Sequence, residues 1–240
     1  MNSKVSICMP THEMNGKGAE YLEHSLGCIE AQTYSNIEVV ISDQSTDDGI
    51  RNLCEAWKDK LDIKYHTFDG ERKSTVNTNN ALRLATGDIL KPMFIDDFLF
   101  TRECIEQMVH ALENNPDAGW VAVGFGHLFQ ESGNIGNFMI PRYHDAIHRG
   151  ENTMSCPSVI AIKRTEELIL LDEKVIWLMD CEWYKRLHNA FGPPIIIEQP
   201  SVIMRVHADS VSTSFNSKQD EKEKELQYVI EKIEGQEALN

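Results

Sequence analysis

The sequence lacks a long apolar run, a low-complexity block and a repeat of fixed period. Its apolar stretches fall well short of the roughly 18–20 residues that span a bilayer. The first residues lead into an apolar strand without the hydrophobic region of a secretory signal. We therefore expect a cytoplasmic protein without a transmembrane segment. The 240 residues are 41% hydrophobic and 25% charged, which is ordinary globular usage and predicts one main domain.

Positive charge is scarce, with 23 Lys and Arg residues against 38 Asp and Glu residues and a net charge of −15. Proteins bind nucleic acids through cations that neutralise phosphates, so this balance argues against a nucleic-acid partner. A small diphosphate ligand is compatible with it, because a divalent cation held by acidic side chains supplies positive charge locally. Cysteine is also sparse, and six residues without a C-x-x-C pair predict reduced, structural thiols.

Apolar, β-branched runs alternate with helical patterns through the first half of the chain. The predicted strands cover residues 5–9, 37–41, 63–68, 88–96 and 120–125. Gly87 is expected to end one helix with a positive φ, and Pro92 predicts an edge position or a bulge for its strand. The alternation predicts an α/β fold with a mostly parallel sheet, in which ligands bind beyond the carboxyl ends of the strands.

The second half of the chain is less regular. Residues 126–155 show no clear period and predict a lid or an acceptor loop. Further strands are expected at 159–162, 195–197 and 202–206, and a helix at 177–187. The tail carries Leu226, Val229, Ile230 and Ile233 on one stripe of a charged helix. Such a stripe docks on its own domain or on a partner, here a second copy of the chain.

Carboxylates follow two of the predicted strands. Asp96 and Asp97 end the strand at 88–96, and adjacent strand residues point to opposite sides, so the two acids are expected to have different roles. Burial of unpaired carboxylates is costly, and a metal ion with ligand hydroxyls would satisfy them. The alternative is a pair of acids that stabilises the next helix through its dipole. Asp43 ends the strand at 37–41, where a carboxylate can accept a hydrogen bond from a pyrimidine imide.

Two later segments also contain candidate functional side chains. Asp180 lies among apolar and aromatic residues, which raise the pKa of a carboxyl group toward the range of a general base. Its alternative role is an ion pair with Lys185 or Arg186 on an amphipathic helix. His207 ends a predicted strand, and a lone histidine at such a position is more often structural than a ligand.

Taken in chain order, these clusters resemble the family 2 glycosyltransferases of the GT-A fold. The similar segments are S-I-C-M-P-T-H-E at 6–13, I-S-D-Q-S-T-D at 41–47, Asn79 with A-T-G-D at 85–88, Asp96-Asp97, M-D-C-E-W at 179–183 and R-V-H at 205–207. The resemblance covers about residues 4–212. It implies a GT-A domain at 1–215, Rossmann-like, with a mostly parallel central sheet flanked by helices and a smaller acceptor-side subregion. An amphipathic helix and tail follow at 216–240.

The resemblance further implies an inverting transferase of the hexosyl type. It would move a sugar from a nucleotide diphosphate sugar, with uridine as the favoured base, to the hydroxyl of a glycan or other acceptor. The residues implied to bind the nucleotide and donor sugar are Pro10, Thr11, Glu13, Asp43, Asn79 and Asp96. Asp97 and His207 are implied to bind Mn²⁺ or Mg²⁺, and Asp180 to be the general base.

Three positions depart from the family pattern. Phe94 stands at the first acid of D-x-D-D, Thr78 at an arginine and Gln44 at a glycine. Lys73 or Arg72 is expected to replace the cation that is lost at Thr78. These departures concern the identity of the donor more than the activity, since the positions of the metal ligands and of the general base are kept.

Two other functions stay open at this point. A nucleotidyltransferase also combines an α/β sheet with acidic metal ligands, but it normally has a basic, Gly-rich loop after the first strand. Residues 11–18 contain two glycines and only one lysine. A non-catalytic protein that binds a nucleotide or glycan is favoured by Phe94 and Thr78, whereas a retained base at Asp180 argues against it.

Overall fold

The computed structural model describes residues 2–207 and 218–238. Its strands are β1 (Val5–Thr11), β2 (Ile37–Asp43), β3 (Asp62–Thr67), β4 (Ile89–Pro92), β5 (Phe98–Leu99), β6 (Trp120–Phe129), β7 (Asn134–Met139), β8 (Ile160–Lys163) and β9 (Ile195–Val206). Its α-helices are α1 (Gly18–Glu30), α2 (Gly49–Trp57), α3 (Ser74–Leu84), α4 (Cys104–Asn114), α5 (Met179–Phe191) and α7 (Gln219–Glu237), with 3-10 turns η1 (Met14–Gly16), η2 (Ile147–Arg149) and η3 (Pro157–Val159).

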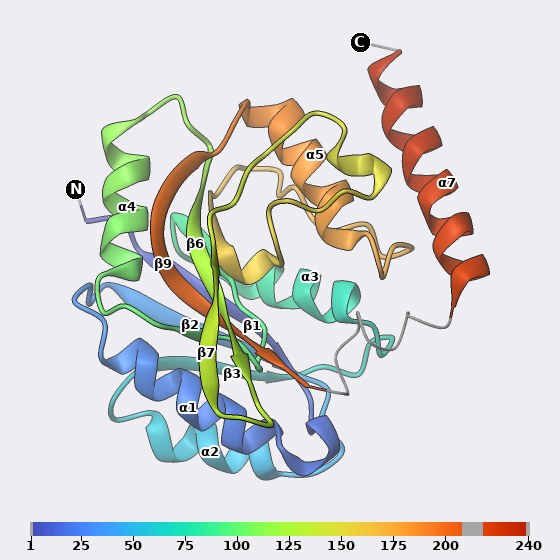
Figure 1. Cartoon of the computed structure of the whole chain (residues 1–240). Helices are drawn as coiled ribbons and strands as arrows, with labels where there is room; N and C mark the ends of the chain where they lie inside the picture. Colours follow the sequence, from blue (N-terminus) through green and yellow to red (C-terminus); the bar gives the residue numbers. More distant parts are fainter. Residues whose placement is uncertain (1, 208–217, 239–240) are drawn as a thin grey trace.

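The described strands form one mixed sheet in the order β3-β2-β1-β4-β8-β6-β9-β5, and β7 pairs with β6. β1 is parallel to β2 and β4, β2 to β3, and β6 to β9. β8 runs antiparallel to both β4 and β6. In Figure 1, α1 and α2 lie side by side on one side of the sheet, and α3 and α5 lie on the other. The predicted α/β fold with a mostly parallel sheet flanked by helices is confirmed.

The expectation for Pro92 is wrong. β4 lies inside the sheet between β1 and β8, and it ends at Pro92 rather than continuing to residue 96. β8 pairs only with Ile89 and Leu90, so Pro92 lies beyond that ladder, where its missing N–H costs no hydrogen bond. Asp96 and Asp97 therefore belong to a turn after the strand, and the alternation of strand side chains does not apply to them.

Gly87 is needed for a different reason than predicted. It does not adopt a positive φ, and the helix before it ends at Leu84. A Cβ at this position would lie 2.6 Å from the carbonyl oxygen of Lys4 and 2.7 Å from Ser6 Oγ. Glycine thus allows the backbone to approach β1 closely, and its N–H donates to Ser6 Oγ at 2.7 Å.

The irregular second half contains more strand than its pattern indicates. Residues 126–129 complete β6, and β7 folds back on it as an antiparallel hairpin. The two strands predicted at 195–197 and 202–206 are one strand, β9, whose pairing with β6 shifts register near Gly124. The interruption at Gln199 and Pro200 is accommodated by this bulge, so the turn-like residues do not end the strand.

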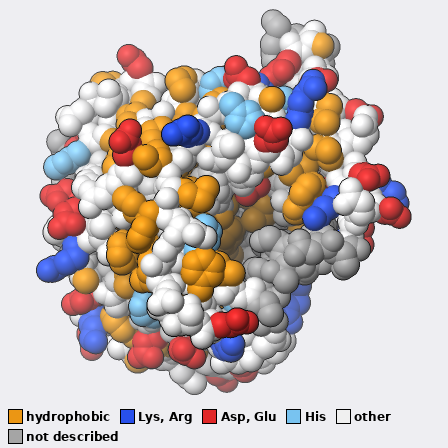
Figure 2. All heavy atoms as spheres, viewed as in Figure 1, with side chains coloured by type: hydrophobic (Ala, Val, Ile, Leu, Met, Phe, Trp, Pro, Cys, Tyr) orange, Lys and Arg blue, Asp and Glu red, His pale blue; other side chains and the backbone are white. Residues whose placement is uncertain are grey.

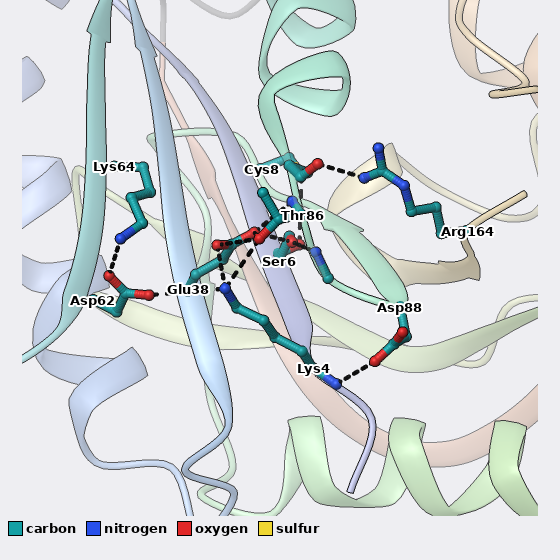
Figure 3. Close-up of polar contacts among 11 residues, drawn as sticks. Lys4, Ser6, Cys8, Glu38, Asp62, Lys64, Thr86, Asp88 and Arg164 are labelled. Carbon is teal, nitrogen blue, oxygen red and sulfur yellow. Dashed lines mark hydrogen bonds and ion pairs between the residues drawn. The ribbon is translucent and has the colours of Figure 1, made fainter. Parts of the chain in front are cut away.

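Glu38 is the centre of a buried polar cluster at the N-terminal ends of β1 and β2 (Figure 3). It accepts hydrogen bonds from Ser6 Oγ at 2.5 Å and Lys4 Nζ at 2.6 Å, and from the backbone N–H and hydroxyl of Thr86. Burial alone would raise the pKa of Glu38, but these donors lower it to about 2. The cluster joins β1, β2 and the loop before β4, and so fixes the base of the parallel half of the sheet.

This cluster predicts a pH-dependent stability. Glu38→Gln should lower the free energy of unfolding by roughly 2–3 kcal/mol in urea titrations at pH 7, because the charged acceptor of a buried network is lost. The contribution should be present above the unfolded pKa near 4.5 and vanish as the pH falls toward 2. Asp62→Asn is the matched control: Asp62 pairs with Lys4 and Lys64 at the surface and should contribute little. Equal effects of the two variants would contradict this role.

The predicted apolar stripe of the C-terminal helix docks on its own chain. Val229 and Ile233 of α7 are fully buried, and α7 packs on η2 and α5. The six cysteines are unpaired, as predicted. Among the described helices, none has both the length and the apolar character that a bilayer crossing requires. The division at residue 215 stays a prediction, as does association of two copies.

Candidate active site

A cleft with a volume of about 1040 Å³ opens at the carboxyl ends of the parallel strands. Its walls come from the segment after β1, the loop before α3, the turn after β4, residues 150–156, the start of α5 and the end of β9. Figure 2 shows this face hollowed near its centre. Ligand pockets of proteins typically measure about 300–1,000 Å³, so a ligand larger than a typical drug fits here.

One end of the cleft is formed by the segment after β1 and the loop before α3. Pro10, Glu13, Arg72 and Lys73 line it. Arg72 donates to both carboxylate oxygens of Glu13, at 2.9 and 3.0 Å, and Lys73 pairs with Glu71 at 2.8 Å. The two cations proposed to replace the family arginine therefore both lie on this wall, and the Arg72–Glu13 pair ties the two segments together.

Three residues predicted to bind the donor do not line the cleft. Asp43 is 1% exposed and accepts hydrogen bonds from Thr11 Oγ1 at 3.1 Å, Ser45 Oγ at 2.6 Å and Tyr65 OH at 2.7 Å. Asn79 is equally buried and joins α3 to the backbone of Leu171. The polar groups of Thr11, Asp43 and Asn79 are thus engaged within the protein rather than exposed in the cleft.

The turn after β4 brings two carboxylates into the cleft beside His207. Asp96 Oδ2 lies 3.0 Å from His207 Nε2, and Asp97 Oδ2 accepts a hydrogen bond from Cys156 Sγ at 3.3 Å. Asp97 is 4% exposed. Its burial, together with the neighbouring charge of Asp96, raises the pKa of Asp97 to about 7. Burial, the main cause, thus disfavours the ionised form of this carboxyl group.

These residues fit a divalent cation. Among residues 2–207 and 218–238 no group of three or more His, Cys, Asp and Glu side chains is arranged as a complete metal site. Mg²⁺ and Mn²⁺ do not need one, since in phosphate-transferring sites one or two carboxylates act together with oxygens of the substrate phosphates. Asp97 and His207, which both line the cleft, provide such a partial set.

Asp180 also lines the cleft, in the first turn of α5. Its Oδ2 accepts a hydrogen bond from Asn152 Nδ2 at 2.6 Å, and its Oδ1 accepts one from the backbone N–H of Cys181 at 2.8 Å. Burial raises the pKa of Asp180 to about 6. The alternative ion pair is wrong, because Arg186 binds Glu182 and Lys185 binds Glu237. The carboxylate is thus oriented but not neutralised.

Seven of the ten predicted site residues meet at this cleft: Pro10, Glu13, Lys73, Asp96, Asp97, Asp180 and His207. Sequence reasoning missed Asn152, which orients Asp180 from the aperiodic stretch 126–155, where no pattern marks it. It also missed Asn77, which lines the cleft from α3 and accepts a hydrogen bond from Ser42 Oγ at 2.6 Å. Trp177 and Cys156 line the cleft as well.

The departures from the family pattern have visible consequences. Phe94 lines the cleft where the family has an acid, which makes this part of the wall apolar. Thr78 is buried and donates to the backbone oxygen of Ser74 at 2.7 Å, so it faces the helix rather than a ligand. Gln44 lines the cleft and donates to the backbone oxygens of Gly70 and Glu71, which fixes the loop that carries Arg72 and Lys73.

Comparison with known sequences gives a consistent match. The model of glycosyl transferase family 2 matches residues 6–170. A glucosyl-dolichyl phosphate glucuronosyltransferase of Haloferax volcanii is 31% identical over 121 residues, which is 50% of this chain and 37% of that protein. An uncharacterized glycosyltransferase of Rickettsia felis is 25% identical over 230 residues, which is 90% of this chain and 36% of that protein.

Solved structures share the fold. S. aureus TarS 1-349 in complex with UDP-GlcNAc matches with a TM-score of 0.65 and 15% identity, over 88% of this chain and 60% of that one. The mannosyltransferase PcManGT from Pyrobaculum calidifontis, in complex with GDP-Man and Mn²⁺, matches with a TM-score of 0.62 and 20% identity, over 89% and 59%. The chain thus spans about a third to three fifths of the length of these relatives.

Proposed function

The chain belongs to glycosyl transferase family 2, and on that premise we propose that its cleft transfers a sugar from a nucleotide diphosphate sugar to an acceptor hydroxyl with inversion. The observation that carries the proposal is the convergence of Asp97, His207 and Asp180 on one cleft. Asp96, the neighbour of Asp97, contacts His207 although the two are 111 residues apart in the sequence. Different groups of the residues that line the cleft are then proposed to have different roles.

The nucleotide is proposed to bind at the end formed by Pro10, Glu13, Arg72 and Lys73. Two cations on this wall suit a ligand with negative phosphates. Asp43 and Thr11 support this end of the cleft without lining it, since Asp43 fixes the loop after β2 through Ser45. UDP is the first nucleotide to test, because UDP-GlcNAc is the ligand of a protein of the same fold.

Asp97 and His207 are the residues proposed to hold Mn²⁺ or Mg²⁺, and Asp96 orients His207 through the 3.0 Å contact. A divalent cation at this position supplies positive charge that offsets the charge of the diphosphate leaving group. The neighbouring wall around Phe94 and Cys156 is largely apolar, which excludes water and strengthens the electrostatic interactions.

Asp180 is proposed as the general base. Its Oδ atoms are held by Asn152 and the N–H of Cys181, so the carboxylate is positioned before the acceptor binds. It accepts the proton of the acceptor hydroxyl while the oxygen forms a bond to the anomeric carbon. The bond from that carbon to the diphosphate oxygen breaks, and the nucleoside diphosphate leaves on the opposite face with the electron pair, which inverts the configuration.

The test is release of nucleoside diphosphate from a panel of UDP- and GDP-sugars, with Mn²⁺ and with EDTA. The proposal predicts slow, metal-dependent hydrolysis of at least one donor, with water as the acceptor. A nucleotidyltransferase would instead make or consume pyrophosphate. A non-catalytic binder would bind a donor and release nothing, and either result would exclude the transferase.

The raised pKa of Asp180 predicts the pH profile of this hydrolysis. The base acts only when it is ionised, and its pKa is raised to about 6, so the rate at saturating metal should fall about tenfold per pH unit below that value. Metal affinity should also rise between pH 6 and 8, because protons compete for Asp97. The measurement is initial rate from pH 4.5 to 8.5 at several Mn²⁺ concentrations. A rate that stays constant down to pH 4.5 would exclude Asp180 as the base.

A further inference from the structure

The C-terminal helix α7 lies beyond the part of the chain that matches the family model, which ends at residue 170. In Figure 1 it stands next to α5, at the periphery of the molecule. Its far end is anchored by several contacts: Lys232 Nζ binds Asp172 and Glu182 at 2.6 Å each, and Glu237 binds Lys185 at 2.9 Å. These contacts dock α7 independently of its first turns.

Glu225, nearer the start of α7, makes a contact of another kind. Its Oε1 accepts the backbone N–H of Leu178 at 2.6 Å, and its Oε2 accepts the backbone N–H of Ile176 at 3.0 Å. Both carboxylate oxygens thus bind main chain on either side of Trp177. The N-cap residue Leu178 makes no side-chain cap hydrogen bond, and Glu225 supplies acceptors for the backbone at the start of α5 from a distant helix.

The neighbouring side chains of α7 hold the same segment. Lys222 Nζ lies 4.9 Å from the centroid of the Trp177 ring, within the range of a cation–π contact. Leu226 packs on Gly150, where a Cβ would lie 3.5 Å from Leu226 Cδ1. Trp177 and Gly150 both line the cleft. One stretch of α7 therefore fixes two parts of the wall that carries Asp180.

We propose that Glu225 is a positioning residue, which fixes Trp177 and the first turn of α5 so that Asp180 faces the acceptor hydroxyl. The proposal rests on the proposed function, and it extends the site to a helix outside the family match. Glu225 acts through the backbone of residues 176–178 and does not itself line the cleft.

The charge of Glu225 gives the contact a second effect. After burial, which is the main cause, Glu225 contributes to the raised pKa of Asp180. Among the described residues, Cys181 and Tyr184 also interact with Asp180, and burial raises the pKa of each of these two groups. The carboxylate of Glu225 thus orients Asp180 and also helps to raise its pKa toward the range of a general base.

Hydrogen exchange tests the positioning role without any ligand. Glu225→Ala should speed exchange of the amides of Ile176 and Leu178 by roughly tenfold or more, because both lose a charged acceptor. Glu225→Gln should give an intermediate increase, since its amide oxygen can still accept. Glu223→Gln is the matched control, as Glu223 is exposed on the same helix and bonds only to Gln219 among the described contacts. Unchanged exchange in Glu225→Ala, or equal loosening of residues 147–149 and 229–233, would overturn the proposal.

Donor hydrolysis tests the consequence for Asp180. With the UDP- or GDP-sugar that the wild type hydrolyses, Glu225→Gln should shift the acidic limb of the rate profile to lower pH, while Glu225→Ala should lower kcat about tenfold or more at similar donor KM. A change of donor KM alone, or an unshifted limb in Glu225→Gln, would contradict the proposal. Absence of hydrolysis in the wild type would instead refute the proposed function, and the exchange result would stand by itself.

Discussion

Asp180→Asn is expected to lower the rate of donor hydrolysis and of sugar transfer by about 10²- to 10⁴-fold. The amide cannot accept the proton of the acceptor, but it keeps the size of the side chain, and its one oxygen can still accept from either Asn152 or the N–H of Cys181. Affinity for the nucleoside diphosphate with Mn²⁺ should stay within about twofold, because Asp180 is not one of the residues proposed to hold the metal or the nucleotide. Calorimetric titration and initial rates measure the two quantities separately.

The same variant should be more stable than the wild type at neutral pH. The pKa of Asp180 is raised from 3.8 to about 6 in the folded protein, so the fold disfavours the ionised carboxylate. The unfolded chain ionises near pH 4, and the wild type therefore loses stability as the pH rises from about 4 to 6. In urea unfolding at pH 8, Asp180→Asn should have a larger free energy of unfolding than the wild type, and this difference should shrink toward pH 4. An Asp180→Asn variant with lost activity and lower stability at pH 8 would indicate a structural role instead.

Asp97→Asn is expected to reduce metal-dependent turnover by about a hundredfold or more, since a bound cation contributes several kcal/mol to stabilising the leaving group. The variant should also lose the increase in nucleotide affinity that Mn²⁺ gives the wild type. Global unfolding is not the expected cause, because the substitution removes a buried charge whose pKa is raised to about 7. Nucleotide affinity with and without Mn²⁺, measured by calorimetry, checks the expectation.

Asp59→Asn serves as the control for this experiment. Asp59 is an exposed carboxylate after α2, so its removal changes the net charge by the same amount away from the cleft. Metal-linked nucleotide affinity should be unchanged in this variant. If Asp97→Asn kept the full effect of Mn²⁺ on nucleotide binding, Asp97 would not be a metal ligand, and the role of the turn after β4 would need another explanation.

The parts of the fold that sequence predicts well are those where periodicity and burial agree. β1 and β2 are continuous apolar runs buried along their length, and their order along the chain predicts that the loops after them share one edge of the sheet. The same argument places Asp43 and the Asp96–Asp97 pair on one rim of the sheet, whereas the place of Asp180 in the site is implied only by the family resemblance. His207 needed the family resemblance, because a single histidine has no pattern of its own.

The features that sequence could not predict have a common physical origin in contacts distant along the chain. Asp43 and Asn79 carry the residue types of a binding site, but Tyr65 and Leu171 engage their polar atoms, and sequence does not show such partners. Asn152 orients Asp180 from 28 residues away, in a stretch without periodicity. The role of Glu225 is hidden in the same manner, since its partners are backbone groups whose position only the fold determines.

The most direct test of the central claim is the melting temperature of the wild-type protein with UDP, with Mn²⁺ and with both. One cleft that holds a cation and a diphosphate together predicts a rise of roughly 5–10 °C when both are present near 100 times their dissociation constants. This rise should exceed the sum of the two separate shifts. If GDP replaces UDP as the better ligand, the same pattern should hold for it. No shift with either nucleotide and metal, or equal shifts with and without Mn²⁺, would contradict a shared metal and diphosphate site in this cleft.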